Sequence, residues 1–276
     1  MGALCVDPER AIEAQRHYLS CTLCEHRCRI NRLAGQRGPC KAGPVPRLIR
    51  HRIEYSEESD LIPSHLFYLS GCDLRCVFCI AELNAFDPSR GQELTSDYFN
   101  EAVAWGVDRG AKNIEWVGGE PTIHLPYLLD LMANCPNLPP VIWKSDFHFT
   151  PEALDLLNGV VDVYLADYKF GNEHCALRLG GGEKYLAAVQ RNLLAAAGRG
   201  RLIVRHLLLP GHTECCFRPI AQWMQENLPE IEFSLRLGYL PSWRSEQYVE
   251  LKSPVTRAEG RQASRLAEEF GLRVIQ

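Results

Sequence analysis

The sequence predicts an α/β fold, a partial (β/α)6 barrel with a small N-terminal four-cysteine metal module. From residue 65 onward, short apolar runs alternate with helical stretches about six times, which is typical of parallel strands joined by crossover helices. Cysteine, glycine and charged residues follow several of these runs, at the strand ends where parallel α/β proteins gather their chemistry. Residues 21–46 are rich in Cys, Gly, Pro and Arg and show no apolar periodicity.

Apolar runs of strand length and amphipathic stretches with capping residues predict the elements in order. The expected strands are residues 65–71, 113–119, 140–146, 160–167, 201–211 and 231–239. The expected helices are residues 7–20, 96–110, 124–134, 151–158, 183–197, 216–228 and 256–271. Asp7, Thr95 and Thr150 are the kind of residue that begins a helix.

The change in composition near residue 60 predicts two domains. Residues 1–60 are expected to hold the N-terminal helix and the cysteine-rich module, with residues 47–62 as the link to the main body. Residues 61–276 are expected to form the partial barrel.

The charge balance predicts neither a nucleic-acid nor a membrane partner. In 276 residues, 30 Lys and Arg nearly balance 34 Asp and Glu, which gives a formal net charge of -4. With 46% hydrophobic residues the chain can bury a sizeable core. No apolar run approaches the ~18 residues of a membrane span, and the N-terminus lacks the apolar core of a signal peptide. We therefore expect a cytoplasmic protein.

Twelve cysteines are unusual for a cytoplasmic chain, and they favour metal binding or redox chemistry over disulfides. Cys21, Cys24, Cys28 and Cys40 form a C-x2-C-x3-C-x11-C group that offers four thiolates. Zinc, a mononuclear iron or a second iron–sulfur cluster all accept four thiolates. His26 could replace one of them. A structural staple and a redox centre both remain open.

A second group, Cys72, Cys76 and Cys79, has the spacing C-x3-C-x2-C in SGCDLRCVFCI. Three thiolates on one loop can hold three irons of a [4Fe–4S] cluster and leave the fourth iron without a protein ligand. A zinc knuckle is the alternative, but structural zinc requires four closed ligands. The segment GGEPT (residues 118–122) follows the next predicted strand, where glycines allow a backbone to approach a ligand closely.

The order of SGCDLRCVFCI, GGEPT, VVDVYLADYK and RHLLLPG, from about residue 61 to 271, resembles the radical S-adenosylmethionine (SAM) superfamily. It is closest in pattern to the pyruvate formate-lyase activating enzyme-like proteins with an N-terminal cysteine cluster. The resemblance implies a [4Fe–4S] cluster on Cys72, Cys76 and Cys79. It also implies that the SAM methionine is bound by Gly118, Gly119, Glu120 and Pro121.

The same resemblance assigns further SAM contacts at three later strands. Asp167 and Lys169 match the D-x-K strand of the activating enzymes. Arg205 matches the arginine of their R-x(4)-P-G strand, where a guanidinium suits the methionine carboxylate. Ser145 corresponds to a polar position near the ribose, whereas its neighbours Lys144 and Asp146 depart from the family pattern.

The implied function is reductive cleavage of SAM to a 5′-deoxyadenosyl radical, which abstracts hydrogen from a protein, peptide or small-molecule substrate. The electron donor would be a flavodoxin or a ferredoxin. One alternative is an activating enzyme that makes a glycyl radical on a partner enzyme. However, SEESDLIPSHLFYLSGC replaces the D-G-P-G-x-R segment that established activators carry before the cluster. A second alternative is an iron–sulfur electron-transfer protein without SAM chemistry.

The five remaining cysteines are expected to be ordinary buried thiols, because free cysteine is commonly buried. They are Cys5, Cys135, Cys175, Cys215 and Cys216. Of these, Cys175 follows the Asp167/Lys169 strand into a loop, and we regard it as the candidate hydrogen donor.

Overall fold

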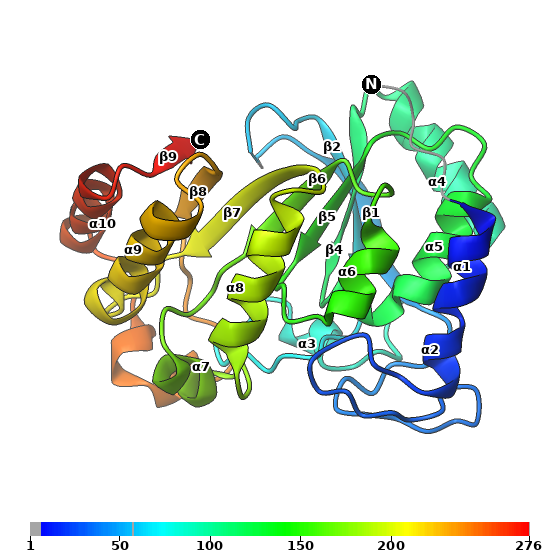
Figure 1. Cartoon of the computed structure of the whole chain (residues 1–276), viewed down its shortest axis with the longest axis horizontal. Coiled ribbons are helices and arrows are strands. Elements are labelled where there is room, and N and C mark those ends of the chain that lie inside the picture. The colour runs from blue at the N-terminus through cyan, green and yellow to red at the C-terminus, as the bar shows by residue number, and fades with distance from the viewer. Residues whose placement is uncertain (1–6, 57, 276) are drawn as a thin grey trace.

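The computed structural model describes residues 7–56 and 58–275, and within them one nine-stranded sheet forms the centre of the protein (Figure 1). Its strand order is β3-β1-β2-β4-β5-β6-β7-β8-β9. From β2 to β9 all neighbours pair in parallel, whereas β1 pairs antiparallel with both β2 and β3. The strands are β1 (Arg47–Glu54), β2 (Ser64–Leu69), β3 (Gln92–Glu93), β4 (Asn113–Gly118), β5 (Val141–Ser145), β6 (Val163–Asp167), β7 (Arg201–Leu207), β8 (Glu232–Arg236) and β9 (Arg273–Ile275).

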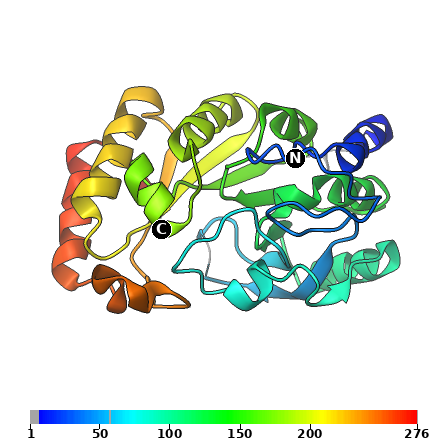
Figure 2. The same cartoon turned by 90° about the horizontal axis from the view of Figure 1, so that it is seen from below.

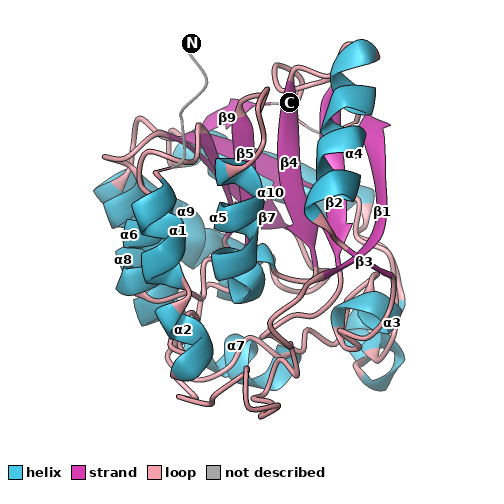
Figure 3. Ribbon diagram, turned by 90° about the vertical axis from the view of Figure 1, so that its right-hand side faces the viewer, coloured by secondary structure: helices cyan, strands magenta, loops and turns pink. Residues whose placement is uncertain are grey.

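Helices connect the parallel strands, and α5, α6 and α8 lie together on one face of the sheet (Figures 1 and 3). The α-helices are α1 (Pro8–Ala14), α2 (Arg16–Leu19), α3 (Glu82–Ala85), α4 (Ser96–Asp108), α5 (Leu125–Ala133), α6 (Pro151–Leu157), α7 (Glu173–Leu179), α8 (Tyr185–Ala196), α9 (Arg218–Asn227) and α10 (Arg257–Glu269). Single turns are η1 (Pro121–His124), the π-turn η2 (Thr213–Phe217), η3 (Ser245–Gln247) and η4 (Val249–Lys252). None of the helices within the described residues is long and apolar enough to cross a membrane.

The α/β class, the six predicted strands and the predicted helices are confirmed, with ends that shift by a few residues. Asp7, Thr95 and Thr150 each cap a helix with their side chains, as their chemistry predicts. The sequence prediction did not include α3, α7, β3 and the edge strand β9, which are too short to show a clear apolar period.

The segment 47–62, expected to be a link, contributes β1 to the sheet. Its pattern RLIRHRIE places three Arg and one His among its apolar residues, so it lacks the continuous apolar run of the central strands. Such a pattern suits a strand near the edge of a sheet, where one face meets solvent. The described part of residues 1–60 therefore comprises α1 and α2, the irregular residues 20–46 and a strand of the main sheet.

Two buried tryptophans fill the space between the sheet and its helices. Trp116 of β4 and Trp143 of β5 are both fully buried. Their indole N–H groups donate to the Met132 sulfur at 3.3 Å and to the Thr122 hydroxyl at 3.1 Å. Satisfying these polar groups allows large aromatic rings to sit in the core without a desolvation penalty.

The carboxyl ends of the parallel strands meet at one edge of the protein. Helices α3 and α7, which follow β2 and β6, lie at the lower edge in Figure 1, and Figure 2 looks onto the loops there. The irregular residues 20–46 lie at the same edge. The architecture thus gathers the predicted functional loops in one place, as parallel α/β folds do.

We expect Gly106→Ala to destabilise the protein, although Ala has a higher helix propensity than Gly. Gly106 lies in α4, where Ala is ordinarily better by about 1 kcal/mol. Here a Cβ would lie 2.2 Å from Nδ1 of His65, a buried ring held by a 2.8 Å hydrogen bond to His51. Overpacking of this kind costs about 1–3 kcal/mol. Urea unfolding should show the loss, whereas Gly198→Ala, with no atom within 4 Å of the added Cβ, should change stability little. Equal or greater stability of Gly106→Ala would contradict this packing.

Candidate active site

A cavity of about 710 Å³ opens at the carboxyl edge of the sheet. Its size falls in the range of small-molecule and cofactor sites. It is lined by all three cysteines of the C-x3-C-x2-C loop and by seven of the eight predicted SAM contacts, namely Gly118, Gly119, Glu120, Ser145, Asp167, Lys169 and Arg205. Pro121 instead begins η1 and is buried.

The loop of residues 71–80, which we call the cluster loop, has little regular structure and is fixed by its neighbours. The backbone N–H groups of Arg75 and Val77 donate to the carbonyl oxygens of Gly180 and Leu179 at the end of α7, at 2.9 and 3.0 Å. In addition, the Arg244 N–H donates to the Val77 carbonyl at 3.0 Å. These contacts orient Cys72, Cys76 and Cys79 without a helix or strand of their own.

Burial keeps the three thiols of the cluster loop protonated in the absence of a cation. It raises the pKa of Cys72 well above its usual range, that of Cys76 to about 12, and that of Cys79 in the same direction. Metal ligation requires thiolates, so metal binding at this loop releases protons. The charge of Lys169 opposes part of the shift at Cys76 and Cys79.

The glycines of GGEPT let β4 end directly against the cluster loop. A Cβ on Gly119 would lie 1.6 Å from the carbonyl oxygen of Gly71, and one on Gly118 would lie 2.3 Å from the backbone of Leu69. Gly118 also has a φ of +136°, a conformation that side chains disfavour. A 2.8 Å hydrogen bond from the Glu120 N–H to the Gly71 carbonyl joins the two segments at this close approach.

Glu120 connects the end of β4 to the end of β5. Its carboxylate accepts hydrogen bonds from the Thr122 N–H, the Ser145 hydroxyl and the Asp146 N–H, each at 2.9 Å. Burial and the charge of Asp73 raise its pKa to about 7. The residue is thus a buried organiser of the cavity wall, and its carboxylate is engaged by the protein itself.

Three charged side chains at the ends of β6 and β7 line the same cavity, and Lys169 among them lies two residues after β6. Lys169 Nζ lies 2.6 Å from Asp167 Oδ2, and Arg205 Nε lies 3.6 Å from Asp167 Oδ1. Burial alone would raise the pKa of Asp167, but the two cations hold it below its usual range. Burial disfavours the charge of Lys169, yet Asp167 and other neighbouring groups raise its pKa. The wall therefore carries one carboxylate and two cations.

Lys144 and Asp146, which depart from the family pattern, both line the cavity but do not form one pair. Lys144 forms a 3.1 Å ion pair with the fully buried Glu115 of β4. Asp146 lies beside Asp73 and Cys72, and burial together with the Asp73 charge raises its pKa well above the usual range. Its Oδ2 atom is buried without a hydrogen-bond partner.

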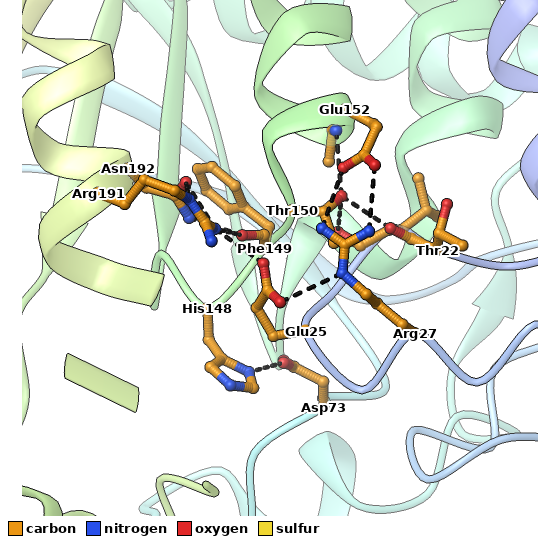
Figure 4. Close-up of polar contacts among 12 residues, drawn as sticks. Thr22, Glu25, Arg27, Asp73, His148, Phe149, Thr150, Glu152, Arg191 and Asn192 are labelled. Carbon is orange, nitrogen blue, oxygen red and sulfur yellow. Dashed lines mark hydrogen bonds and ion pairs between the residues drawn. The ribbon is translucent and has the colours of Figure 1, made fainter. Parts of the chain in front are cut away.

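The sequence reasoning missed the pair of Asp73 and His148. Asp73 Oδ2 lies 2.9 Å from His148 Nδ1, and both side chains are buried (Figure 4). Burial opposes the charge of His148, but the hydrogen bond to Asp73, the charge of Asp73 and the charges of other acidic neighbours together outweigh burial and raise its pKa. The His26 ring adds a 3.0 Å contact to the Asp73 carbonyl oxygen. The only signal for this pair in the local sequence was the position of Asp73 between Cys72 and Cys76.

The irregular residues 20–46 dock against the segment that follows β5 (Figure 4). Arg27 donates to both carboxylate oxygens of Glu152 in α6, at 3.1 and 3.2 Å. Arg191 of α8 donates to Glu25 at 2.8 Å and to the Phe149 carbonyl at 3.0 Å. The N-terminal cysteines are thereby held close to the cluster loop, and the charge of Asp73 contributes to the raised pKa of Cys24, after burial.

Cys175 does not line the cavity, so the placement gives no support to its role as a hydrogen donor. It lies in α7 beside His212, Cys215 and Cys216. The expectation that the remaining cysteines are buried holds for Cys175 and Cys216 and is wrong for Cys215, which is exposed. Cys135 is half-buried, and Cys5 lies outside the described residues. Three of the cysteines that are scattered along the sequence therefore lie together in the folded protein.

The fold and the site define a class: a partial-barrel α/β protein with a three-cysteine metal loop at the mouth of its sheet. The sequence profile of the radical SAM superfamily matches residues 66–224. The chain belongs to the radical SAM superfamily, as its motifs predict. Membership implies a [4Fe–4S] cluster and SAM.

Known proteins are similar to this chain in sequence or in fold. The uncharacterised protein MJ0674 of Methanocaldococcus jannaschii is 31% identical over 277 residues, which cover 95% of this chain and 78% of MJ0674. SuiB of Streptococcus suis, bound to the precursor peptide SuiA, superposes with a TM-score of 0.55 at 15% identity, over 74% of this chain and 46% of SuiB. TYW1 with a lysine–pyruvate adduct superposes with a TM-score of 0.52 at 15% identity, over 75% of this chain and 73% of TYW1. The SuiB and TYW1 structures share the fold of this chain over the regions that superpose.

The residues of the cavity fit the cluster and SAM. Cys72, Cys76 and Cys79 face one space, which supplies the three thiolates that the cluster needs. The unpartnered Asp146 Oδ2 offers a buried acceptor to a ligand donor, and Arg205 and Lys169 offer cations to a carboxylate.

We expect the contribution of the Asp73–His148 pair to stability to depend on pH. The folded pKa of His148 is raised, so the pair contributes fully below about pH 6.5 and loses its contribution as the pH rises through that raised value. The pKa of Asp73 is lowered, so at acid pH the pair loses its contribution to stability only below the usual pKa of an Asp side chain. His148→Gln should cost about 1–3 kcal/mol near pH 6 and less near pH 9.

Urea unfolding of the reduced protein at both pH values measures this difference. His174→Gln, at an exposed position of α7, is the control and should show no pH-dependent cost. A cost of His148→Gln that is equal at both pH values would show that the histidine packs as a neutral ring.

Proposed function

We propose that this protein reductively cleaves SAM and removes a hydrogen atom from a peptide or protein segment held at the cavity mouth. The observation that carries the proposal is that the three cysteines of the cluster loop and seven of the eight predicted SAM residues line one cavity. When bound, the cluster and SAM supply one-electron reduction and a 5′-deoxyadenosyl radical. A flavodoxin or a ferredoxin is the expected electron donor.

The protein's own residues would bind and orient SAM. Arg205 and Lys169 suit the methionine carboxylate, because both are held charged beside Asp167. The backbone at Gly118 and Gly119 can approach the methionine amino group, since no side chain intervenes. Ser145 stands at the predicted ribose position, with its hydroxyl oriented by Glu120.

Exposed apolar side chains at the cavity favour a peptide over a small polar metabolite. Ile80, Leu237 and Leu240 all line the cavity and are 77%, 43% and 62% exposed. A group of exposed aliphatic residues marks a surface that a partner covers. SuiB, which shares the fold, was solved with its precursor peptide, and this is consistent with a peptide substrate here.

We further propose that Cys21, Cys24, Cys28 and Cys40 hold a metal or an iron–sulfur cluster. Arg32 is fully buried between Cys21 and Cys40, with Nη2 at 3.1 and 3.8 Å from their sulfurs. A buried guanidinium needs compensating negative charge. Four thiolates bound to a metal or a cluster supply negative charge, which would meet that need. In the described residues no three of the four sulfurs lie within 4.8 Å of one another, so the spacing favours a cluster over a single ion.

The test of the proposed reaction is anaerobic reconstitution with iron and sulfide, followed by dithionite, SAM and chromatographic detection of 5′-deoxyadenosine. Cys76→Ala should reduce product to background, because the cluster loses one of three ligands. Cys135→Ala, which changes a cysteine outside both groups, should retain wild-type product. Cys24→Ala tests whether the N-terminal site is needed for cleavage.

A wild-type protein that binds a cluster but forms no 5′-deoxyadenosine would overturn the proposal and favour electron transfer. Product formed in the absence of any peptide would support cleavage. The substrate class is then tested by whether a peptide with an apolar segment raises the rate, and whether Leu240→Glu lowers that increase by a larger factor than it lowers peptide-free cleavage.

A further inference from the structure

Four potential metal ligands that do not line the active-site cavity meet between α7 and the turn that follows β7. Cys175 comes from α7, whereas His212, Cys215 and Cys216 come from the turn that follows β7. One ligand atom from each lies within 4.8 Å of all the others. We propose that these residues form a tetrahedral zinc site.

The distances match a single ion. His212 Nδ1 lies 3.6, 3.3 and 3.7 Å from the sulfurs of Cys175, Cys215 and Cys216, and the Cys175 and Cys215 sulfurs are 3.9 Å apart. Zn–S and Zn–N bonds of about 2.3 and 2.05 Å in a tetrahedron give S···S edges of about 3.8 Å and S···N edges of about 3.6 Å. Three cysteines and one histidine are a closed set for structural zinc.

Local sequence explains why three of the ligands point the same way. His212, Cys215 and Cys216 stand at positions i, i+3 and i+4, which share one face of a helical turn. The turn is a π-turn, in which the N–H groups of Cys216 and Phe217 both donate to the His212 carbonyl, at 3.0 and 3.1 Å. Such π-turns are often found at functional sites.

The surroundings supply the outer contacts that metal sites need. His212 Nε2, the ring nitrogen that faces away from the sulfurs, lies 3.4 Å from Arg178 Nη2 and 3.7 Å from the carboxylate of Glu250, which itself pairs with Arg178. With Nδ1 on the ion, Nε2 carries a proton, and of these two neighbours only Glu250 can accept it. Asn172 Nδ2 donates to the sulfurs of Cys175 and Cys216 at 3.3 and 3.7 Å. Cys215 is exposed, so an ion can enter from solvent.

The site connects two loops that shape the active-site cavity. Cys175 lies eight residues after Asp167 and Cys215 ten residues after Arg205, so the ion would join the connections that leave β6 and β7. The end of α7 in turn accepts the hydrogen bonds from Arg75 and Val77 of the cluster loop. Zinc would therefore act as a structural staple beneath the cluster loop.

The test compares zinc content by elemental analysis after anaerobic purification and reconstitution of the iron–sulfur cluster. Cys215→Ser should lose one zinc per chain relative to wild type, and its exposed position limits the risk to folding. Glu250→Gln keeps all four ligands and should weaken zinc binding about 10–100-fold in a chelator competition. Cys135→Ser and Cys24→Ala, outside this site, should keep this ion.

A crystal measured at the zinc edge should place an anomalous peak among the four residues. Three outcomes would overturn the proposal: unchanged zinc content in Cys215→Ser, iron in place of zinc at the peak, or a Cys175–Cys215 disulfide in the native protein. Zinc content is independent of SAM cleavage, so failure of the proposed reaction leaves this test intact.

Discussion

The conformation of the cluster loop is the constraint on which the site depends, because an irregular segment must hold three cysteines in one fixed arrangement. Four parts of the protein fix it. They are the glycine approach of β4 at Gly71, the end of α7 at Arg75 and Val77, the C-terminal segment at Val77, and the Asp73–His148 pair. Each is a backbone contact or a buried polar pair, so none tolerates a shift of about 1 Å without losing a hydrogen bond. The barrel thus supplies the rigidity that the loop lacks.

The same region distributes charge unevenly among three buried carboxyl groups. Asp73 keeps its charge because His148 pairs with it, and that charge helps to raise the pKa of both Glu120 and Asp146. Two carboxyl groups therefore accept protons more readily at the place where three thiols must lose theirs. This arrangement limits the negative charge that accumulates beside the cluster loop, and Lys169 offsets part of what remains.

Sequence reasoning recovered most of the fold and the cavity lining, because both follow local patterns. The apolar runs identify β2 to β8 apart from the two-residue β3, and the motifs at their ends identify ten cavity residues, which are the three cysteines of the cluster loop and seven SAM contacts. The missing parts depend on contacts between distant segments. The ring of His148 meets Asp73 across 75 positions, and Cys175 meets His212 across 37. No periodicity encodes such pairs. The helical spacing of His212, Cys215 and Cys216 was a local signal that could have been used.

The docking of residues 20–46 has a consequence for the synthesis of the protein on the ribosome. Arg27 binds Glu152, which follows it by 125 positions, and Glu25 binds Arg191, which follows it by 166. The four N-terminal cysteines are thus translated long before the surface that receives them. During that interval they have no shelter from oxidants or competing ions.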